Sequence, residues 1–276
     1  MSRLQKLMTL LKSQAHPSVN GLTCGVCVVF GVHSVFQASL GTLGAVRMVS
    51  TIGSKFKSCR MPDMPKEGVV QYRCDLHPGA PATESQIVAL ADARQELYVR
   101  DAIGCDLSRY GACYGNVSMR TGSWAAGPGR REFLISCTAT GGDSELSATR
   151  ISRVTHYDHD KNYVIAQGPC PPSSESMTHG AIYDASLDVR AVVHGHAPIL
   201  WQWLLDNSAP STPPEVDYGT PEMAESARKL VQGGLKNPWR LPGVIVMAGH
   251  QDGVVGFGSS VKQAIDRFLA AYDAAA

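Results

Sequence analysis

The chain has 276 residues, which corresponds to one large domain or two small ones. Hydrophobic residues make up 44% and charged residues 18%, which permits a sizeable core and argues against disorder of the whole chain. The net charge of +1 conceals an asymmetry. Residues 1–62 hold seven basic and no acidic residues, and residues 63–276 hold the other 18 basic and all 24 acidic residues. This body, with a net charge of −6, argues against nucleic-acid binding.

The N-terminal part, residues 1–66, differs from the rest and is treated as an extension preceding a domain at 67–276. It is basic and rich in Ser and Gly, and residues 1–12 fit a basic amphipathic helix. This composition favours a mitochondrial presequence. A membrane anchor fits the length, but the Gly and Ser content argues against it. A third alternative is an extension without a catalytic role. We expect a cytoplasmic protein, or a mitochondrial one if the extension acts as a presequence.

From about Gly68 the pattern is that of an α/β domain. Thr83 and Gln86 form a capping box, which predicts a helix from there to about Ala102. Apolar segments predict strands at 131–137 and 163–166, a helix at 175–186 and a strand at 189–194. The Pro-rich segment 208–214 is expected to be a surface loop.

The C-terminal third continues the alternation of helices and strands. A helix is expected to begin at Pro221 and to end near Gln232, before two consecutive glycines. Strands follow at 244–247 and 254–257, and Ser259 is expected to cap a last helix that ends near Tyr272.

The eight cysteines are scattered at a density far below that of a disulfide scaffold. We interpret most of them as small apolar side chains in a reducing compartment. The pair Cys24 and Cys27 lacks a second such pair or a nearby histidine, which disfavours a metal or redox role. The others are Cys59, Cys74, Cys105, Cys113, Cys137 and Cys170.

Three histidines follow apolar strands. His194 and His196 are two residues apart, so an extended chain directs both imidazoles to the same side. Alone, this pattern also fits ordinary core histidines. His250 follows a second apolar strand, and if the two strands are neighbours the three side chains converge. Three protein ligands with one open position are typical of a catalytic Zn²⁺ or similar divalent cation.

Several turns offer small polar groups. Ser173, Ser174 and Glu175 precede a predicted helix, whose first N–H groups favour an anion. The alternative is plain N-capping by a serine. The segments 114–118 and 138–142 are further small-polar turns, each of which can cradle phosphate oxygens or be only a turn.

Together these residues resemble the class II aldolase/adducin family, over roughly residues 84–272. The resemblance rests on an ordered set of motifs: GNVSMR (115–120), FLIS…TATGG (133–142), PSSE (172–175), AVVHGH (191–196), YGTPEMAE (218–225) and MAGHQDG (247–253). It implies a three-layer α/β/α domain with a central, mainly antiparallel sheet. It also implies a homotetramer with sites at subunit interfaces.

The resemblance assigns roles to individual residues. His194, His196 and His250 would hold Zn²⁺, and Glu175 would be the catalytic acid/base and also touch the metal. A phosphate subsite would be formed by five residues: Asn116, Thr140, Gly141, Ser173 and Ser174. The sequence departs from the family where Gln251 and Asp252 separate His250 from the next glycine, and where SCTATGG is longer than the usual turn.

Three further residues are candidates beside the site. His179 lies four residues after Glu175 and therefore on the same helix face, as a partner of Glu175 or of the metal, or as a gap-filling polar residue. Tyr218 could reach the substrate. Tyr272 is the candidate in the C-terminal tail for a tyrosine that neighbouring subunits supply in some family members.

The leading functional hypothesis is a zinc-dependent lyase of the aldolase type. It would cleave or form a carbon–carbon bond in a small hydroxylated, phosphorylated, carbohydrate-like molecule. One alternative keeps the metal site but performs epimerisation or dehydration of a sugar phosphate. Another is a non-catalytic, adducin-like interaction module, which would be expected to have lost the ligands that this sequence retains.

Overall fold

The computed structural model describes residues 68–236 and 239–276. The proposed extension at 1–66, with Cys24 and Cys27, therefore lies outside the described residues. Within the described part of the chain, no helix is long and apolar enough to cross a membrane.

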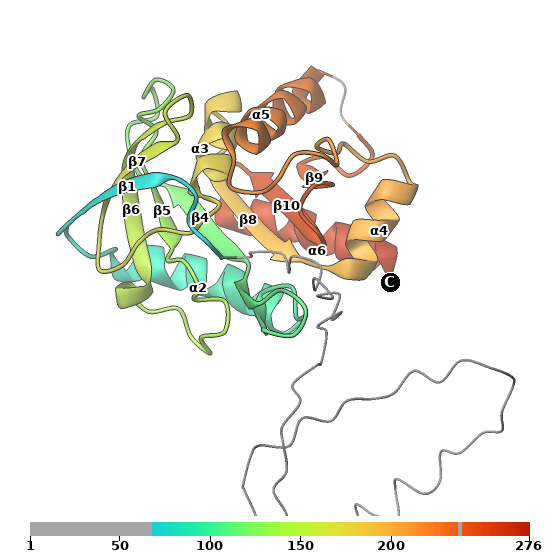
Figure 1. Cartoon of the computed structure of the whole chain (residues 1–276), viewed down its shortest axis with the longest axis horizontal. Helices are drawn as coiled ribbons and strands as arrows, with labels where there is room; N and C mark the ends of the chain where they lie inside the picture. Colours follow the sequence, from blue (N-terminus) through green and yellow to red (C-terminus); the bar gives the residue numbers. More distant parts are fainter. Residues whose placement is uncertain (1–67, 237–238) are drawn as a thin grey trace, which may run out of the picture. The chain divides into compact units, whose positions relative to one another are not determined.

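A single large sheet forms the centre of the domain (Figure 1). Its eight strands lie in the order β1-β7-β6-β5-β4-β8-β10-β9, and β1 pairs with β7 in parallel while the other neighbours are antiparallel. A separate hairpin joins β2 to β3. The strands are β1 Arg73–His77, β2 Gly104–Asp106, β3 Ala112–Tyr114, β4 Asn116–Arg120, β5 Phe133–Ser136, β6 Ile151–Asp158, β7 Tyr163–Gln167, β8 Ala191–His196, β9 Val244–Val246 and β10 Gly253–Gly258.

Helices cover both faces of the sheet, as Figure 1 shows. The helices α2 (Glu84–Tyr98), α4 (Pro198–Asp206) and α6 (Val261–Ala275) share one apolar core with the sheet. The helices α3 (Ser176–Ala185) and α5 (Pro221–Lys236) share a second core on the other face. A 3₁₀ turn spans Ala148–Arg150. The expected three-layer α/β/α architecture with a mainly antiparallel sheet is confirmed.

Strand β8 shows how the two layers use alternate residues. Ala191 and Val193 belong to the core under α2, α4 and α6, and Val192 belongs to the core under α3 and α5. Because side chains of a strand alternate between faces, His194 and His196 point to the same face as Val192. The two histidines predicted as ligands on β8 therefore lie on the α3/α5 side.

Several predicted elements differ from the observed ones. Helix α5 continues through Gly233 and Gly234 to Lys236 instead of ending at Gln232. A glycine costs about 1 kcal/mol in a helix relative to alanine. The apolar stripe of α5, which includes Met223 and Val231, is fully buried against the α3 layer and overrides this cost. The last helix is capped by Ser260 rather than Ser259, because the Ser260 side chain accepts the hydrogen bond from the Gln263 N–H.

Two segments expected to be loops contribute to the sheet. Thr212, in the Pro-rich segment 208–214, is buried, and its N–H donates to the Val246 carbonyl at the edge of β9. The segment 114–118 is a turn only at Gly115, which has a φ of +81°, and β4 begins at Asn116. In both cases backbone N–H and C=O groups that have no partner within their own segment form hydrogen bonds with the sheet.

The interpretation of the cysteines as reduced side chains is wrong for four of the five that the structure describes. Cys105 pairs with Cys113 across the β2–β3 hairpin, and Cys137 pairs with Cys170, 33 residues later. Cys74 is a free thiol. No signal in the sequence indicates these pairs, because spacing alone does not determine which cysteines meet.

Candidate active site

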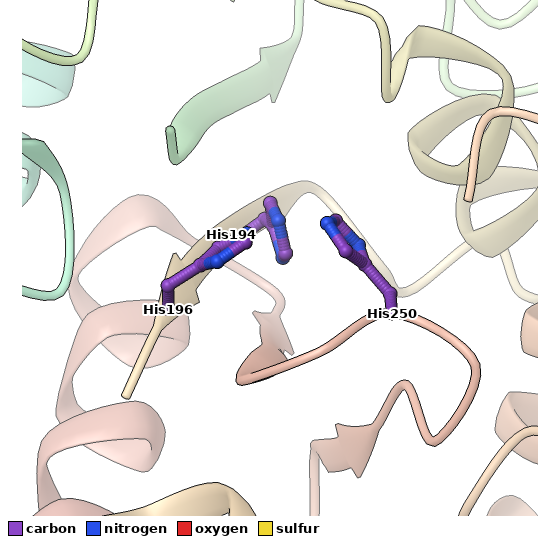
Figure 2. Close-up of side chains that lie close together, drawn as sticks. All are labelled: His194, His196 and His250. Carbon is purple, nitrogen blue, oxygen red and sulfur yellow. The ribbon is translucent and has the colours of Figure 1, made fainter. Parts of the chain in front are cut away.

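The three predicted histidines converge at the end of β8 (Figure 2). Each offers one ring nitrogen, and these three atoms lie within 4.8 Å of one another. The ring centroids of His194 and His250 are 5.0 Å apart, and those of His196 and His250 are 4.7 Å apart. All three side chains are buried. We call this group, together with Glu175, the metal corner.

Antiparallel pairing brings His250 back to β8. Strand β10 lies between β8 and β9, and Gly253 is in register with His196. The turn from β9 to β10 carries His250. It is closed by hydrogen bonds from the His250 N–H to the Met247 carbonyl and from the Gly253 N–H to the His250 carbonyl. His250 thereby lies beside His194 and His196, although it is more than 50 positions away from them in the sequence.

Hydrogen bonds and burial prepare the imidazoles to act as ligands. His194 Nδ1 lies 3.2 Å from the Val254 carbonyl oxygen, which can only accept, so Nδ1 carries the proton and Nε2 keeps its lone pair. Burial lowers the pKa of His196 well below its usual value, and the nearby His250, His194 and Arg109 act in the same direction. The neutral form that a metal requires is therefore favoured.

Glu175 completes the metal corner from α3. Its side chain is buried, and Oε1 lies 3.8 Å from Nδ1 of His250. It precedes the first residue of α3, where the helix dipole favours a carboxylate. Ser173 Oγ accepts a hydrogen bond from the Glu175 N–H in the turn before α3. The N-cap residue is Glu175 and no side chain caps the helix, so neither serine is the N-cap. Three imidazoles and one carboxylate form a donor set that fits a divalent cation such as Zn²⁺.

The three small-polar turns meet beside the metal corner, and we call them the anion cradle (residues 114–116, 138–142 and 171–174). The Thr138 N–H donates to the Pro171 carbonyl, which joins two of the turns. Gly141 approaches the third so closely that a Cβ there would lie 2.1 Å from the Tyr114 carbonyl oxygen. The five predicted phosphate ligands, all buried, are Asn116, Thr140, Gly141, Ser173 and Ser174.

A buried arginine that sequence analysis missed supports the anion cradle. Nη2 of Arg94, on α2, donates to the carbonyls of Thr140 at 3.0 Å and Gly141 at 2.8 Å, and also to that of Asp143. A trans peptide points its C=O and N–H in opposite directions. The N–H groups that follow these carbonyls in sequence therefore point away from Arg94. The sequence offered one signal for this role, namely that Arg94 is a charged residue at one of the buried positions of α2.

Both disulfides border the same turns. Cys137 directly precedes the second turn of the cradle and Cys170 directly precedes the third, so their disulfide links the two. A Cβ on Gly142 would lie 2.9 Å from Cys105 Cβ, which places the other disulfide against the end of the second turn. One disulfide thus links two turns of the cradle covalently, and the other packs against the second turn.

Asp252 forms a second support, on the side of the metal corner. Its Oδ2 accepts hydrogen bonds from Tyr110 Oη at 2.7 Å and from Arg109 Nε at 2.9 Å. The Tyr110 ring in turn packs edge-on against the ring of His196, with 4.7 Å between centroids. Asp252 departs from the family pattern in sequence, and the structure gives it a defined set of partners.

Of the three remaining candidates, two lie near the metal corner and one lies away from it. Tyr218 stacks on His250 with 4.9 Å between ring centroids, which places it at the metal corner. His179 is fully buried and contacts Ser118. Tyr272 lies on α6, in the opposite helix layer, and donates to the carbonyl of Arg100, so within one chain it is not part of the site.

The structure is an α/β fold with a buried cluster of three histidines that could hold a metal ion, and comparison with known proteins gives its family. The profile described as the Class II Aldolase and Adducin N-terminal domain matches residues 107–276, and the chain belongs to this family. A comparison with curated protein sequences finds no match.

Two solved structures are similar to this chain. The crystal structure of a sugar-phosphate aldolase from Thermotoga maritima matches with a TM-score of 0.52 and 18% identity, over 69% of this chain and 92% of that one. An L-fuculose-1-phosphate aldolase from Thermus thermophilus matches with a TM-score of 0.49 and 18% identity, over 70% and 92% of the two chains. At 18% identity the likeness to the Thermotoga maritima structure establishes the fold alone.

Proposed function

We propose that the protein is a metal-dependent aldehyde-lyase. It would cleave or form a carbon–carbon bond in a small hydroxylated, phosphorylated, carbohydrate-like molecule. The observation that carries this proposal is the metal corner, in which three buried imidazole donors lie within 4.8 Å of one another beside a buried carboxylate. Family membership supports the same class of chemistry.

The metal corner would hold Zn²⁺ or another divalent cation through His194, His196 and His250, with Glu175 as an additional ligand. A cation bound there supplies Lewis acidity, which stabilises the negative charge that develops on a substrate oxygen as the carbon–carbon bond breaks. Neutral imidazoles leave the charge of the cation undiminished, which the lowered pKa of His196 favours.

Glu175 would move the proton. Aldol cleavage removes a proton from a hydroxyl group and returns one to carbon, and a carboxylate beside the reacting atoms can perform both transfers. Burial excludes water from Glu175, and its position at the start of α3 fixes it against the corner. General acid/base assistance of this kind contributes about 10²–10⁴-fold to a rate.

The anion cradle would bind a phosphate group through Asn116, Thr140, Gly141, Ser173 and Ser174. Exposed N–H groups and hydroxyls before a helix are suited to a dianion. Binding energy from this remote group would orient the carbons that react. We further propose a homotetramer, which sedimentation or light scattering of the purified chain would test.

The test begins with metal analysis of the purified chain, followed by assays of ketose phosphates and product identification. We expect about one divalent cation per chain. We expect release of an aldehyde, and a loss of about 10²–10⁴-fold in kcat for Glu175→Gln with the metal retained. Glu132→Gln, a change of the same kind at a residue remote from the metal corner, is the matched control. A folded, metal-free and inactive protein would support the interaction-module alternative. An epimer or a dehydrated product would show that the reaction is epimerisation or dehydration rather than cleavage.

A further inference from the structure

The hairpin β2–β3 is the one pair of strands in the described residues that lies outside the large sheet, and its loop binds Asp252. Tyr110 Oη donates to Asp252 Oδ2 at 2.7 Å, and Arg109 Nε donates to the same oxygen at 2.9 Å. Nη2 of Arg109 lies 2.8 Å from it, and the Asp252 side chain is 5% exposed. One buried carboxylate oxygen therefore holds two residues of the hairpin loop.

The backbone of Asp252 connects the turn of His250 to the end of β8. Its φ of +65° lies in the left-handed region, and its carbonyl accepts a hydrogen bond from the Ala197 N–H at 2.9 Å. Ala197 directly follows His196, and Asp252 lies two residues after His250. Glycine takes a left-handed conformation without steric cost, so the backbone alone would favour glycine at this position. What an aspartate adds there is its carboxylate, and the contacts of that carboxylate are with the hairpin loop.

Tyr110 carries the connection from Asp252 to His196. Its ring meets that of His196 edge-on, with 4.7 Å between the centroids and 80° between the planes. Tyr114, at the end of the hairpin, packs 4.8 Å from Tyr110 and 5.1 Å from His196. Because its hydroxyl is bonded to Asp252, the Tyr110 ring cannot turn away from the imidazole without breaking a buried hydrogen bond. Groups that hold a ligand ring from outside affect metal affinity without touching the metal.

We propose that Asp252 is a positioning residue for the metal corner, which acts on His196 through Tyr110 and on His250 through the turn to which both belong. The two imidazoles come from separate segments, the end of β8 and the turn before β10 (Figure 2). Ligands on separate segments bind a cation well only if the segments are held in one arrangement. Asp252 fastens both segments to the same hairpin loop. This role rests on the metal-binding part of the proposed function and not on the reaction that follows.

Zinc affinity of the metal-free full chain, measured by competition with a chromophoric chelator, tests this role without turnover. Tyr110→Phe keeps the ring against His196 and removes only the hydroxyl that Asp252 holds. We expect the Kd for Zn²⁺ to rise about 10–100-fold. Tyr157→Phe is the matched control, because it removes a buried hydroxyl that is bonded to Asp184 at 2.8 Å, between β6 and the end of α3. This control should keep the wild-type affinity.

Two changes of Asp252 separate the carboxylate from the backbone. Asp252→Gly keeps the left-handed backbone accessible and removes the carboxylate, whereas Asp252→Asn keeps an oxygen that can accept from Tyr110. We expect a rise of about 10–100-fold in the Kd for Asp252→Gly and a smaller rise for Asp252→Asn. Tyr110→Phe combined with Asp252→Gly should bind zinc no more weakly than Asp252→Gly alone, because both changes remove one connection.

Co²⁺ in place of Zn²⁺ shows whether the coordination itself changes, since the visible absorption of bound Co²⁺ depends on the number and geometry of its ligands. We expect a changed spectrum in Tyr110→Phe and the wild-type spectrum in Tyr157→Phe, even if both variants lose thermal stability. A residue that only supports the fold would lower stability and leave both the zinc affinity and the Co²⁺ spectrum as they are.

The outcomes distinguish this role from the proposed function. Wild-type zinc affinity and an unchanged Co²⁺ spectrum in Tyr110→Phe and Asp252→Gly would overturn the positioning role and leave the proposed function standing. If Asp252→Gly does not fold, Tyr110→Phe decides alone. Additive losses in the double variant would overturn the connection through Tyr110. A folded wild-type chain that binds neither cation would remove the proposed function, and the role of Asp252 with it.

Discussion

The metal corner and the anion cradle lie side by side but are built differently. The corner consists of side chains, whose positions follow from the register of β8 with β10 and from the start of α3. The cradle consists largely of backbone, held by a buried guanidinium and a disulfide. A single substitution can therefore remove one donor atom from the corner, whereas the cradle is changed mainly through the groups that support it.

The largest effect is expected from removing a side chain of the corner. His196→Ala should remove one of three imidazole donors and lower kcat by about 10³-fold or more, because the cation supplies several kcal/mol of charge stabilisation. Metal content and kcat are measured together. His156→Ala, on β6, is the control. Full metal occupancy and full activity in His196→Ala would contradict the assignment of the corner.

The next effect concerns the covalent support of the cradle. Opening the Cys137–Cys170 disulfide by the double change to serine frees a loop of 33 residues, which the chain-entropy model values at about 3–4 kcal/mol. For a domain of this size each kcal/mol corresponds to about 2–4 °C in Tm. Calorimetry measures the shift, and Cys74→Ser, which removes a free thiol, should leave Tm nearly unchanged.

A change at Arg94 tests the cradle without substituting any of the proposed phosphate ligands. Arg94→Met removes the donor to three carbonyls and should raise KM for a phosphorylated substrate by about 10–100-fold, the loss expected from one or two charged hydrogen bonds. Arg94→Lys retains the charge but not the planar guanidinium, and should fall in between. The same KM increase for an unphosphorylated substrate would mean that Arg94 does not act through the cradle.

The smallest effect is a dependence of stability on pH. The pKa values of His179 and His196 are lowered in the folded protein, so below about pH 6.5 the unfolded chain binds more protons. The free energy of unfolding of the metal-free protein should fall by about 1 kcal/mol per histidine between pH 7 and 5.5. Urea titrations measure this, and His179→Gln should show the smaller decrease. A stability that rises as the pH falls would contradict it.

The metal corner was predictable and the supports of the cradle were not. The spacing of His194 and His196 on an apolar strand determines which face both imidazoles take, and His250 follows a strand of the same type. Arg94, by contrast, is one charge in a helix, and its meaning depends on carbonyls 46 to 49 residues away. The cysteine pairs depend in the same way on which turns the sheet brings together.

The sequence by itself determined most helices and strands, the family and the four residues of the metal corner, because these are encoded in local periodicity and in fixed spacings. Tertiary structure alone decided that α5 runs through two glycines, that Asn116 begins a strand, that four cysteines are paired, and that Asp252 joins the β2–β3 hairpin to the turn of His250. Each of these depends on contacts between segments distant in sequence, whose burial and hydrogen bonds outweigh the local preferences of the residues involved.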